Sequence, residues 1–235
     1  MKRSSRTLAA LTNCILVVII AVVSTVCFLP RAESVSGVKD EVYYKGFSQN
    51  GVSLMFNVYW GTKEVNAILD VLDEHEAKAT FFIGGSWADD NVECLEEIAS
   101  RGHELGSHGY FHRDHAGLDY AGNLQEIKTS IDFIERATGI AVKLFAPPSG
   151  AYNDHTVNAA RELGLKTILW SKDTIDWRDK NVDVCFTRAT KNVTGGDLIL
   201  MHPMAHTLEA LPSILKHYAQ AGLRTVTVSE NIARS

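Results

Sequence analysis

The fold is decided by the stretch VSLMFNVYWGTKEVNAILDVLDEHEAKATFFI, residues 52–83. It opens with an apolar run, Val52–Val58, that is typical of a buried strand. The stretch Glu64–His75 then places four apolar residues on one helical face: Val65, Ile68, Leu69 and Leu72. A second apolar run, Ala79–Ile83, follows after a short connection. This order predicts a strand, a helix and a parallel second strand.

The same alternation continues along the chain. Further strands are predicted at Glu104–Gly106, Lys143–Ala146, Thr167–Trp170, Leu198–Met201 and Thr225–Val228. Further helices are predicted at Val92–Ser100, Asn123–Thr138, Asp154–Leu163, Val182–Asn192 and Leu208–Ala221. Four glycines stand where C-terminal caps belong: Gly102, Gly139, Gly164 and Gly222. About seven units predict an α/β barrel one unit short of eight, with an open doubly wound sheet as the alternative.

The N-terminus has the pattern of a targeting element. Lys2, Arg3 and Arg6 precede an apolar run from Leu8 to Leu29, which is about the 20 residues that a membrane-spanning helix needs. We predict a signal-anchor over residues 1–30, a linker over 31–44 and a folded domain over 45–235, with a cleaved signal as the alternative. The basic flank favours a single-pass protein of the cell membrane whose domain is extracytoplasmic.

Composition and net charge indicate which kinds of partner the protein can bind. Hydrophobic residues make up 46% of the 235 residues and charged residues 22%, which is ordinary for a globular domain. The net charge is −5 and no basic patch lies beyond the N-terminus, so nucleic acid is not expected as a partner. Cys94 and Cys185 lack metal-ligand spacing, and we interpret them as separate small side chains in preference to a disulfide.

Polar residues gather where the predicted strands end. They are Asn57 after the first strand, His108 and His112 after the third, Asp173 and Asp176 after the fifth, and His202 after the sixth. The C-terminal ends of parallel barrel strands are where active sites are built. We therefore expect these side chains around one cleft.

Each of these groups has a chemical and a structural interpretation. His108 and His112 are four residues apart, so one helical turn would aim both at a divalent metal, although surface histidines are the alternative. Asp176 could orient His202 as a general acid or base, or it could only cap a helix. The loop Pro147–Gly150 could supply backbone N–H groups to an oxyanion, or be merely a turn.

Taken in order, these segments resemble the catalytic domain of polysaccharide deacetylases, the NodB-homology family, from about Val42 to Ile232. The segments that carry the resemblance are Leu54–Val58, Ala79–Phe82, Gly102–His112, Phe145–Gly150, Asp173–Trp177 and Leu200–Pro203. Trp60-Gly61 is similar to a sporulation-associated branch of spore-forming bacteria.

The resemblance implies a distorted (β/α)7 barrel that removes acetyl groups from polysaccharides with the help of a zinc-like divalent metal. It assigns His108 and His112 to the metal, His202 with Asp176 to the acid side, and Ser149, Trp177 and Leu200 to the oxyanion and substrate. Three positions depart from the family pattern. Asn57 replaces the usual base aspartate, Val58 replaces the third metal ligand, and Ala146 replaces an arginine.

Two functions follow from the resemblance and its departures. The first is a hydrolase that removes acetyl groups from peptidoglycan or a related amino-sugar polymer, with impaired or altered catalysis. The second is an inactive protein of the same fold that binds or scaffolds wall polysaccharide. An amide at position 57 cannot take up a proton at neutral pH, so we expect turnover to be low or absent. We expect metal binding to be weak or absent, because only two histidines are offered.

Overall fold

The computed structural model describes residues 42–234 of the chain. The predicted signal-anchor, residues 1–30, and most of the predicted linker lie outside the described residues. Within residues 42–234, no helix has both the length and the apolar character needed to cross a membrane.

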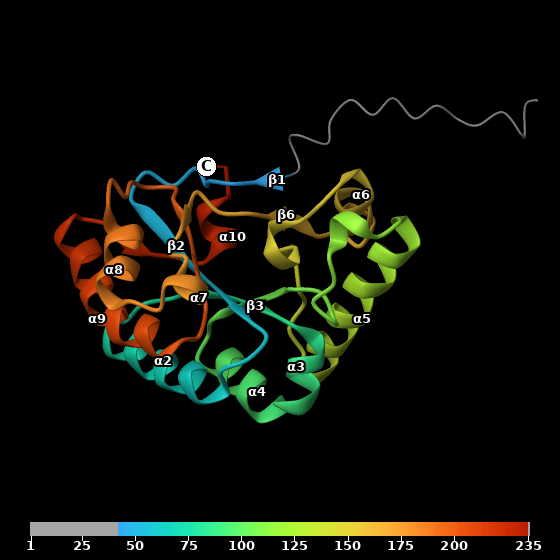
Figure 1. The fold of residues 1–235 in the computed structure, drawn as a ribbon, viewed down its shortest axis with the longest axis horizontal. Coiled ribbons are helices and arrows are strands. Elements are labelled where there is room, and N and C mark those ends of the chain that lie inside the picture. Colours follow the sequence, from blue (N-terminus) through green and yellow to red (C-terminus); the bar gives the residue numbers. More distant parts are fainter. Residues whose placement is uncertain (1–41, 235) are drawn as a thin grey trace, which may run out of the picture. The chain divides into compact units, whose positions relative to one another are not determined.

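The described strands form one parallel sheet. They are β1 (Val42–Tyr43), β2 (Gly51–Val58), β3 (Thr80–Ile83), β4 (Glu104–Ser107), β5 (Leu144–Phe145), β6 (Lys166–Ile168), β7 (Lys172–Asp173), β8 (Leu198–Met201) and β9 (Arg224–Thr225). Their order is β1-β6-β5-β4-β3-β2-β8-β7, and β9 pairs with β2. Strands β2 to β6 are neighbours in chain order, as in a barrel and unlike the reversed order of a doubly wound sheet. The sheet curls into a partial barrel (Figure 1), which confirms the parallel α/β prediction.

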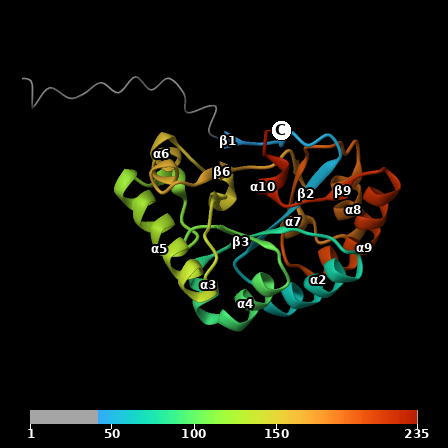
Figure 2. The ribbon, with the colours of Figure 1, turned by 180° about the vertical axis from the view of Figure 1, so that it is seen from behind.

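The described helices are α2 (Thr62–Glu74), α3 (Gly85–Asp90), α4 (Val92–Ser100), α5 (Tyr120–Thr138), α6 (Asp154–Glu162), α7 (Asp176–Asp179), α8 (Val182–Thr190), α9 (Ala205–Gln220) and α10 (Val228–Asn231). Most of them cover the outer side of the curl, whereas Val228 of α10 packs in an apolar cluster inside it. Helices α9, α2, α4 and α5 follow one another around the sheet (Figures 1 and 2). The four predicted capping glycines all have the expected left-handed backbone, with φ between 70° and 73°.

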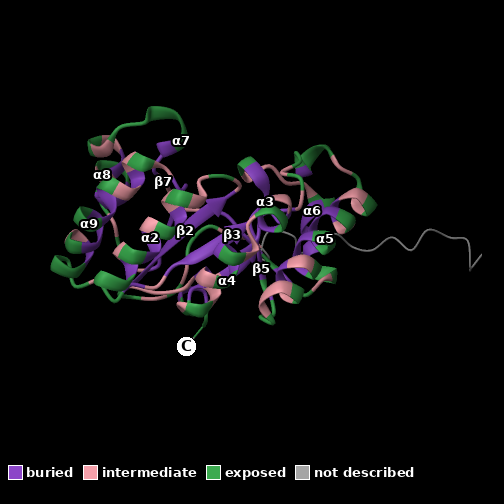
Figure 3. Ribbon diagram, turned by 90° about the horizontal axis from the view of Figure 1, so that it is seen from below, coloured by how far each residue is buried: buried purple, intermediate pink, exposed green. Residues whose placement is uncertain are grey.

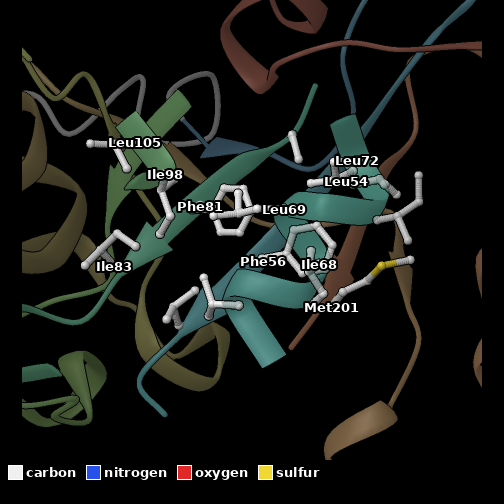
Figure 4. Close-up of a cluster of buried hydrophobic side chains, with 14 of the residues drawn as sticks. Leu54, Phe56, Ile68, Leu69, Leu72, Phe81, Ile83, Ile98, Leu105 and Met201 are labelled. Atoms are coloured by element: carbon white, nitrogen blue, oxygen red, sulfur yellow. The ribbon is translucent and has the colours of Figure 1, made fainter. Parts of the chain in front are cut away.

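The main core lies between the sheet and the helices. Alternation along β2 sends Leu54, Phe56 and Val58 into this core, where they meet Phe81 of β3. Figure 4 shows Phe56 and Phe81 beside Ile68 and Leu69 of α2. Met55 points the other way, into a smaller apolar cluster inside the curl. The strands are therefore buried on both faces, whereas the helices keep exposed outer surfaces (Figure 3).

Several boundaries differ from the prediction, and two of these differences have a clear structural cause. Strand β1 falls within the range predicted as linker, and its two residues pair with Thr167 and Ile168 of β6. The predicted strand Thr225–Val228 ends early because Thr227 and Glu230 form a capping box. The Thr227 hydroxyl accepts from the Glu230 N–H (3.2 Å), and the Glu230 carboxylate accepts from the Thr227 N–H (3.0 Å). This pairing starts helix α10.

The segment Lys45–Phe47 joins the β1 end of the sheet to the residues that precede β8. We call it the strap. Its Gly46 N–H donates to the Gly196 carbonyl at 2.7 Å, and its Lys45 ammonium lies 3.2 Å from the Asp197 carboxylate. The Phe47 N–H donates to the Asn231 carbonyl at 2.8 Å. The strap therefore ties three separate parts of the chain together.

Cys94 and Cys185 are free and buried, which confirms the interpretation as separate side chains.

Candidate active site

The C-terminal ends of the strands surround one cavity of about 280 Å³. Asn57 is the next-to-last residue of β2, His108 directly follows β4, and His202 directly follows β8. The lining residues are Asn57, Trp60, His108, His112, Ser149, Trp170, Asp173, Trp177, Leu200 and His202. Eight of the candidate site residues from the sequence analysis lie around this cavity: Asn57, His108, His112, Ser149, Asp173, Trp177, Leu200 and His202.

The pair Asp176 and His202 is fixed by hydrogen bonds. His202 Nδ1 lies 2.7 Å from Asp176 Oδ1, and the His202 backbone N–H donates to Asp176 Oδ2 at 2.7 Å. Thr207 also donates to Oδ2, at 2.8 Å. Burial alone would raise the pKa of Asp176, but its hydrogen bonds with His202 outweigh burial and lower that pKa. Asp176 is therefore a carboxylate that accepts from Nδ1 of His202, so the Nε2 atom of His202 is the ring nitrogen that Asp176 leaves unengaged.

Asp176 also begins helix α7, where its Oδ1 accepts from the Trp177 N–H at 2.8 Å. The N-cap of α7 is Ile175 and no side chain caps this helix, so the orienting interpretation of Asp176 holds and the capping interpretation does not. With its oxygens already accepting from His202, Thr207 and Trp177, this carboxylate is not free to take a proton from water. Trp177 is 50% exposed and stands at the cavity rim.

The two histidines of the third segment lie in a loop. The expectation of a helical turn is wrong, because Gly109 and His112 have left-handed backbones, with φ of 75° and 54°. The ring centroids of His108 and His112 are nevertheless 5.1 Å apart. The loop is held by buried Glu126, whose Oε2 accepts from the Tyr110 N–H at 2.8 Å and the Phe111 N–H at 2.9 Å.

His108 is a neutral imidazole. Its Nδ1 lies 2.7 Å from the Ala146 carbonyl oxygen and therefore carries the proton, which leaves Nε2 as an acceptor. Burial, followed by repulsion from His112, lowers the pKa of His108 to about 3. Burial likewise lowers the pKa of His112.

The three positions that depart from the family pattern are all buried. The Asn57 side chain lines the cavity at 4% exposure, and its Oδ1 has no hydrogen-bond partner among the described residues. Val58 is fully buried in the core between sheet and helices, and Ala146 is fully buried in the smaller cluster inside the curl. Neither Val58 nor Ala146 lines the cavity.

A catalytic zinc normally has three protein ligands. Within residues 42–234, no group of three or more His, Cys, Asp or Glu side chains is placed to hold a metal ion. His108 and His112 supply two donors, while Val58 supplies an apolar side chain in the core. These residues do not fit a three-ligand site. Weak binding through the two histidines stays a prediction.

The proline loop forms a 3₁₀ turn, Pro148–Gly150. The Gly150 N–H donates to the Pro147 carbonyl at 2.9 Å, and the Ala151 N–H donates to the Pro148 carbonyl at 3.0 Å. Those two N–H groups close the turn and do not serve an oxyanion. Ser149 lines the cavity with a left-handed backbone, φ 55°.

Two neighbours of the pair Asp176 and His202 were not predicted from the sequence. The Trp60 indole stacks on the His202 ring, with centroids 5.8 Å apart and planes 5° apart. In the sequence Trp60 stands out only through the Trp60-Gly61 pair, yet it is 40% exposed and lines the cavity. Thr207 is one turn into α9 and has no distinguishing sequence signal. Only the tertiary fold brings Trp60 and Thr207 to the pair.

The family model described as polysaccharide deacetylase matches residues 45–168, which is more than half of the chain. This chain belongs to the polysaccharide deacetylase family. One relative within the family, the uncharacterized protein YlxY of Bacillus subtilis, is 35% identical over 191 residues. That alignment covers 81% of this chain but 60% of YlxY. A peptidoglycan-N-acetylglucosamine deacetylase of Bacillus cereus is 34% identical over 174 residues, covering 69% of this chain and 79% of the relative.

Solved structures similar to this chain include a pseudoenzyme. The crystal structure of a wild-type CE4-family pseudoenzyme from Bacillus anthracis matches with a TM-score of 0.79 and 33% identity, covering 82% of this chain and 69% of that one. A mutant of that pseudoenzyme, described as having restored enzymatic activity, matches with the same TM-score and 31% identity. Polysaccharide deacetylases similar to this chain thus include active enzymes and a pseudoenzyme.

Proposed function

We propose that this protein binds N-acetylated amino-sugar polymers of the bacterial cell wall in the cavity, with a deacetylase activity that is low or absent. The observation that carries the proposal is the contrast between two sides of one site. The acid side keeps the hydrogen-bonded pair Asp176 and His202. The base side presents Asn57, whose amide cannot accept a proton at neutral pH.

The missing general base sets the expected loss of deacetylation rate. General acid–base help of this kind typically contributes about 10²–10⁴-fold to the rate. Asp176 cannot replace the missing base, because its oxygens already accept hydrogen bonds from His202, Thr207 and Trp177. His202 would have to act first as base and then as acid, which is slower. Family membership supports a polysaccharide ligand, and the peptidoglycan deacetylases among the relatives support wall polymer.

The test is acetate release from peptidoglycan and from chito-oligosaccharides, using full-length protein in detergent and measuring its metal content. We expect glycan binding with little acetate, and metal that is lost on dialysis against a chelator. Rapid acetate release together with stoichiometric, chelator-resistant zinc would contradict the proposal and would require a third metal ligand.

We further propose that the domain is held outside the cytoplasmic membrane by the N-terminal segment. The basic residues before an apolar run of about 20 residues support this topology. It would place the cavity in the compartment where wall polymer is found. The Trp60-Gly61 pair adds support for a role in spore-forming bacteria, as in the branch it resembles.

A further inference from the structure

The side-chain amide of Asn57 is an unusual group to find in the lining of this cavity. It is 4% exposed, and its Oδ1 has no hydrogen-bond partner among the described residues. A buried carbonyl without a donor costs about 1–3 kcal/mol, so a water or a ligand in the cavity that supplies the donor would be stabilised there. An amide offers an acceptor and two donors, whichever way it is turned.

The groups around Asn57 are mostly neutral or apolar. His108 presents the acceptor nitrogen Nε2, because its Nδ1 carries a proton toward the Ala146 carbonyl, and His202 has its Nδ1 engaged by Asp176. Asp173 is a carboxylate in the lining, and its Oδ1 already accepts from the Ile175 N–H at 2.8 Å. The remaining walls include Trp60, Trp170, Trp177 and Leu200. An apolar cavity with a few polar groups suits a neutral ligand that has both donors and acceptors.

We propose that Asn57 recognises the intact acetamido group of the sugar. Its Oδ1 accepts the acetamido N–H and its Nδ2 donates to the acetamido carbonyl, so both polar atoms of the ligand amide are satisfied. Binding then needs no metal and selects the acetylated polymer over the deacetylated one. This inference rests on the proposed function. It gives the asparagine at position 57 a role in recognising the ligand.

A carboxylate at the same position would behave differently. Aspartate has nearly the shape of asparagine but has no N–H to donate to the acetamido carbonyl. Its negative charge would instead attract the ammonium group of a deacetylated sugar. Asn57→Asp should therefore shift the preference of the cavity toward the free amine without changing the cavity's size.

Calorimetric titration of full-length protein in detergent, with a chelator present throughout, tests this inference. The probes are the tetramer of N-acetylglucosamine and the tetramer of glucosamine. For wild type we expect the acetylated tetramer to bind at least about tenfold more tightly, since two hydrogen bonds separate the ligands. Asn57→Leu should lose roughly that factor, and Asn57→Asp should favour the glucosamine tetramer. Asn66→Leu, on the outer helix α2, is the matched control and should bind as wild type does.

The possible outcomes distinguish a failure of glycan binding from a failure of the role proposed for Asn57. If wild type binds neither tetramer, the proposed function itself is wrong. If wild type binds both equally, or if Asn57→Asp leaves the preference unchanged, glycan binding stands and the role of Asn57 is overturned. Thermal melting of each variant shows whether it is folded, and Asn57→Asp is nearly isosteric, so its result decides even if Asn57→Leu unfolds.

Discussion

The Asp176 carboxylate is a buried charge held by its neighbours. It accepts hydrogen bonds from His202 Nδ1, the His202 N–H, the Trp177 N–H and the Thr207 hydroxyl. Asp176→Asn would set an N–H₂ group against some of these donors. We expect the free energy of unfolding to fall by about 2–4 kcal/mol, measured by urea denaturation. Asp183→Asn, on the exposed side of α8, should change it by less than about 0.5 kcal/mol. Equal effects of the two substitutions would show that the pair does not stabilise the fold.

His103 makes the stability of the protein depend on pH. Burial, then repulsion from Lys78, lowers the pKa of His103 to about 4 from the model-compound value of 6.5. Its Nδ1 accepts from the Ala79 N–H at 3.4 Å. Since the unfolded chain binds this proton more readily, the stabilisation is complete above pH 6.5 and is lost as the pH falls toward 4. We expect that loss to reach about 3 kcal/mol at pH 4.

Unfolding free energies measured by urea denaturation between pH 4 and 7 check this prediction. His103→Asn keeps an acceptor near the Ala79 N–H but cannot titrate, so its slope with pH should be shallower. His75→Asn removes an exposed imidazole and should keep the wild-type slope. An unchanged slope in His103→Asn would show that His103 does not cause the dependence of stability on pH.

The polar residues at the strand ends could be predicted from the sequence because the C-terminal ends of parallel strands meet at one edge. Asn57, His108 and His202 illustrate this, since each lies at or directly after a strand that an apolar run marks. Trp60 and Thr207 could not be predicted as partners of Asp176 and His202. Their roles depend on distances between elements that are far apart in the chain.

At the scale of elements, the long periodic segments were predictable and the short ones were not. Helix α4 and strand β8 have the predicted bounds, because each is a continuous run of one period. The turn expected at His108–His112 fails because Glu126, on a different element, captures two backbone N–H groups of the loop. Strands β1 and β7 have two residues each, which is too short for a periodic signal.

The strap gives a test at this scale. A Cβ added at Gly46 would lie 2.5 Å from the carbonyl oxygen of buried Asn231, whose Nδ2 donates to Ser53 Oγ at 3.0 Å. Gly46→Ala should therefore lower the unfolding free energy by about 1–3 kcal/mol, because the packed neighbours cannot move freely. Gly117→Ala is the matched control, since its Cβ would approach no atom closer than 3.9 Å. If both variants melt at the wild-type temperature, the strap is not tightly packed.

At the scale of the whole molecule, the alternation of strands and helices predicted a parallel α/β fold. The chain order of β2 to β6 makes it barrel-like. The connection that the strap makes between β1 and the start of β8 could not be predicted from the sequence. It depends on backbone hydrogen bonds from the strap to Gly196 and Asn231, and such bonds leave no mark on residue type.

The proposed membrane anchoring is also a property of the whole chain. Lys2, Arg3 and Arg6 before the apolar run predict that the protein sediments with membranes and that external protease digests the domain in cells stripped of wall. Extraction should need detergent and not high salt. Recovery of a soluble form that lacks Met1 to Pro30 would show a cleaved signal instead.

The site is proposed to keep the acid group, His202 with Asp176, and to lack a general base at Asn57. Acetate release is the measurement that tests this proposal. Wild type, Asn57→Ala, Asn57→Asp and His202→Ala are compared on chito-oligosaccharide and peptidoglycan. We predict low or absent release for wild type and little gain from Asn57→Asp, because Val58 and Ala146 remain buried apolar residues. Robust wild-type release that His202→Ala abolishes and Asn57→Ala leaves unchanged would contradict the claim and identify His202 as the working base.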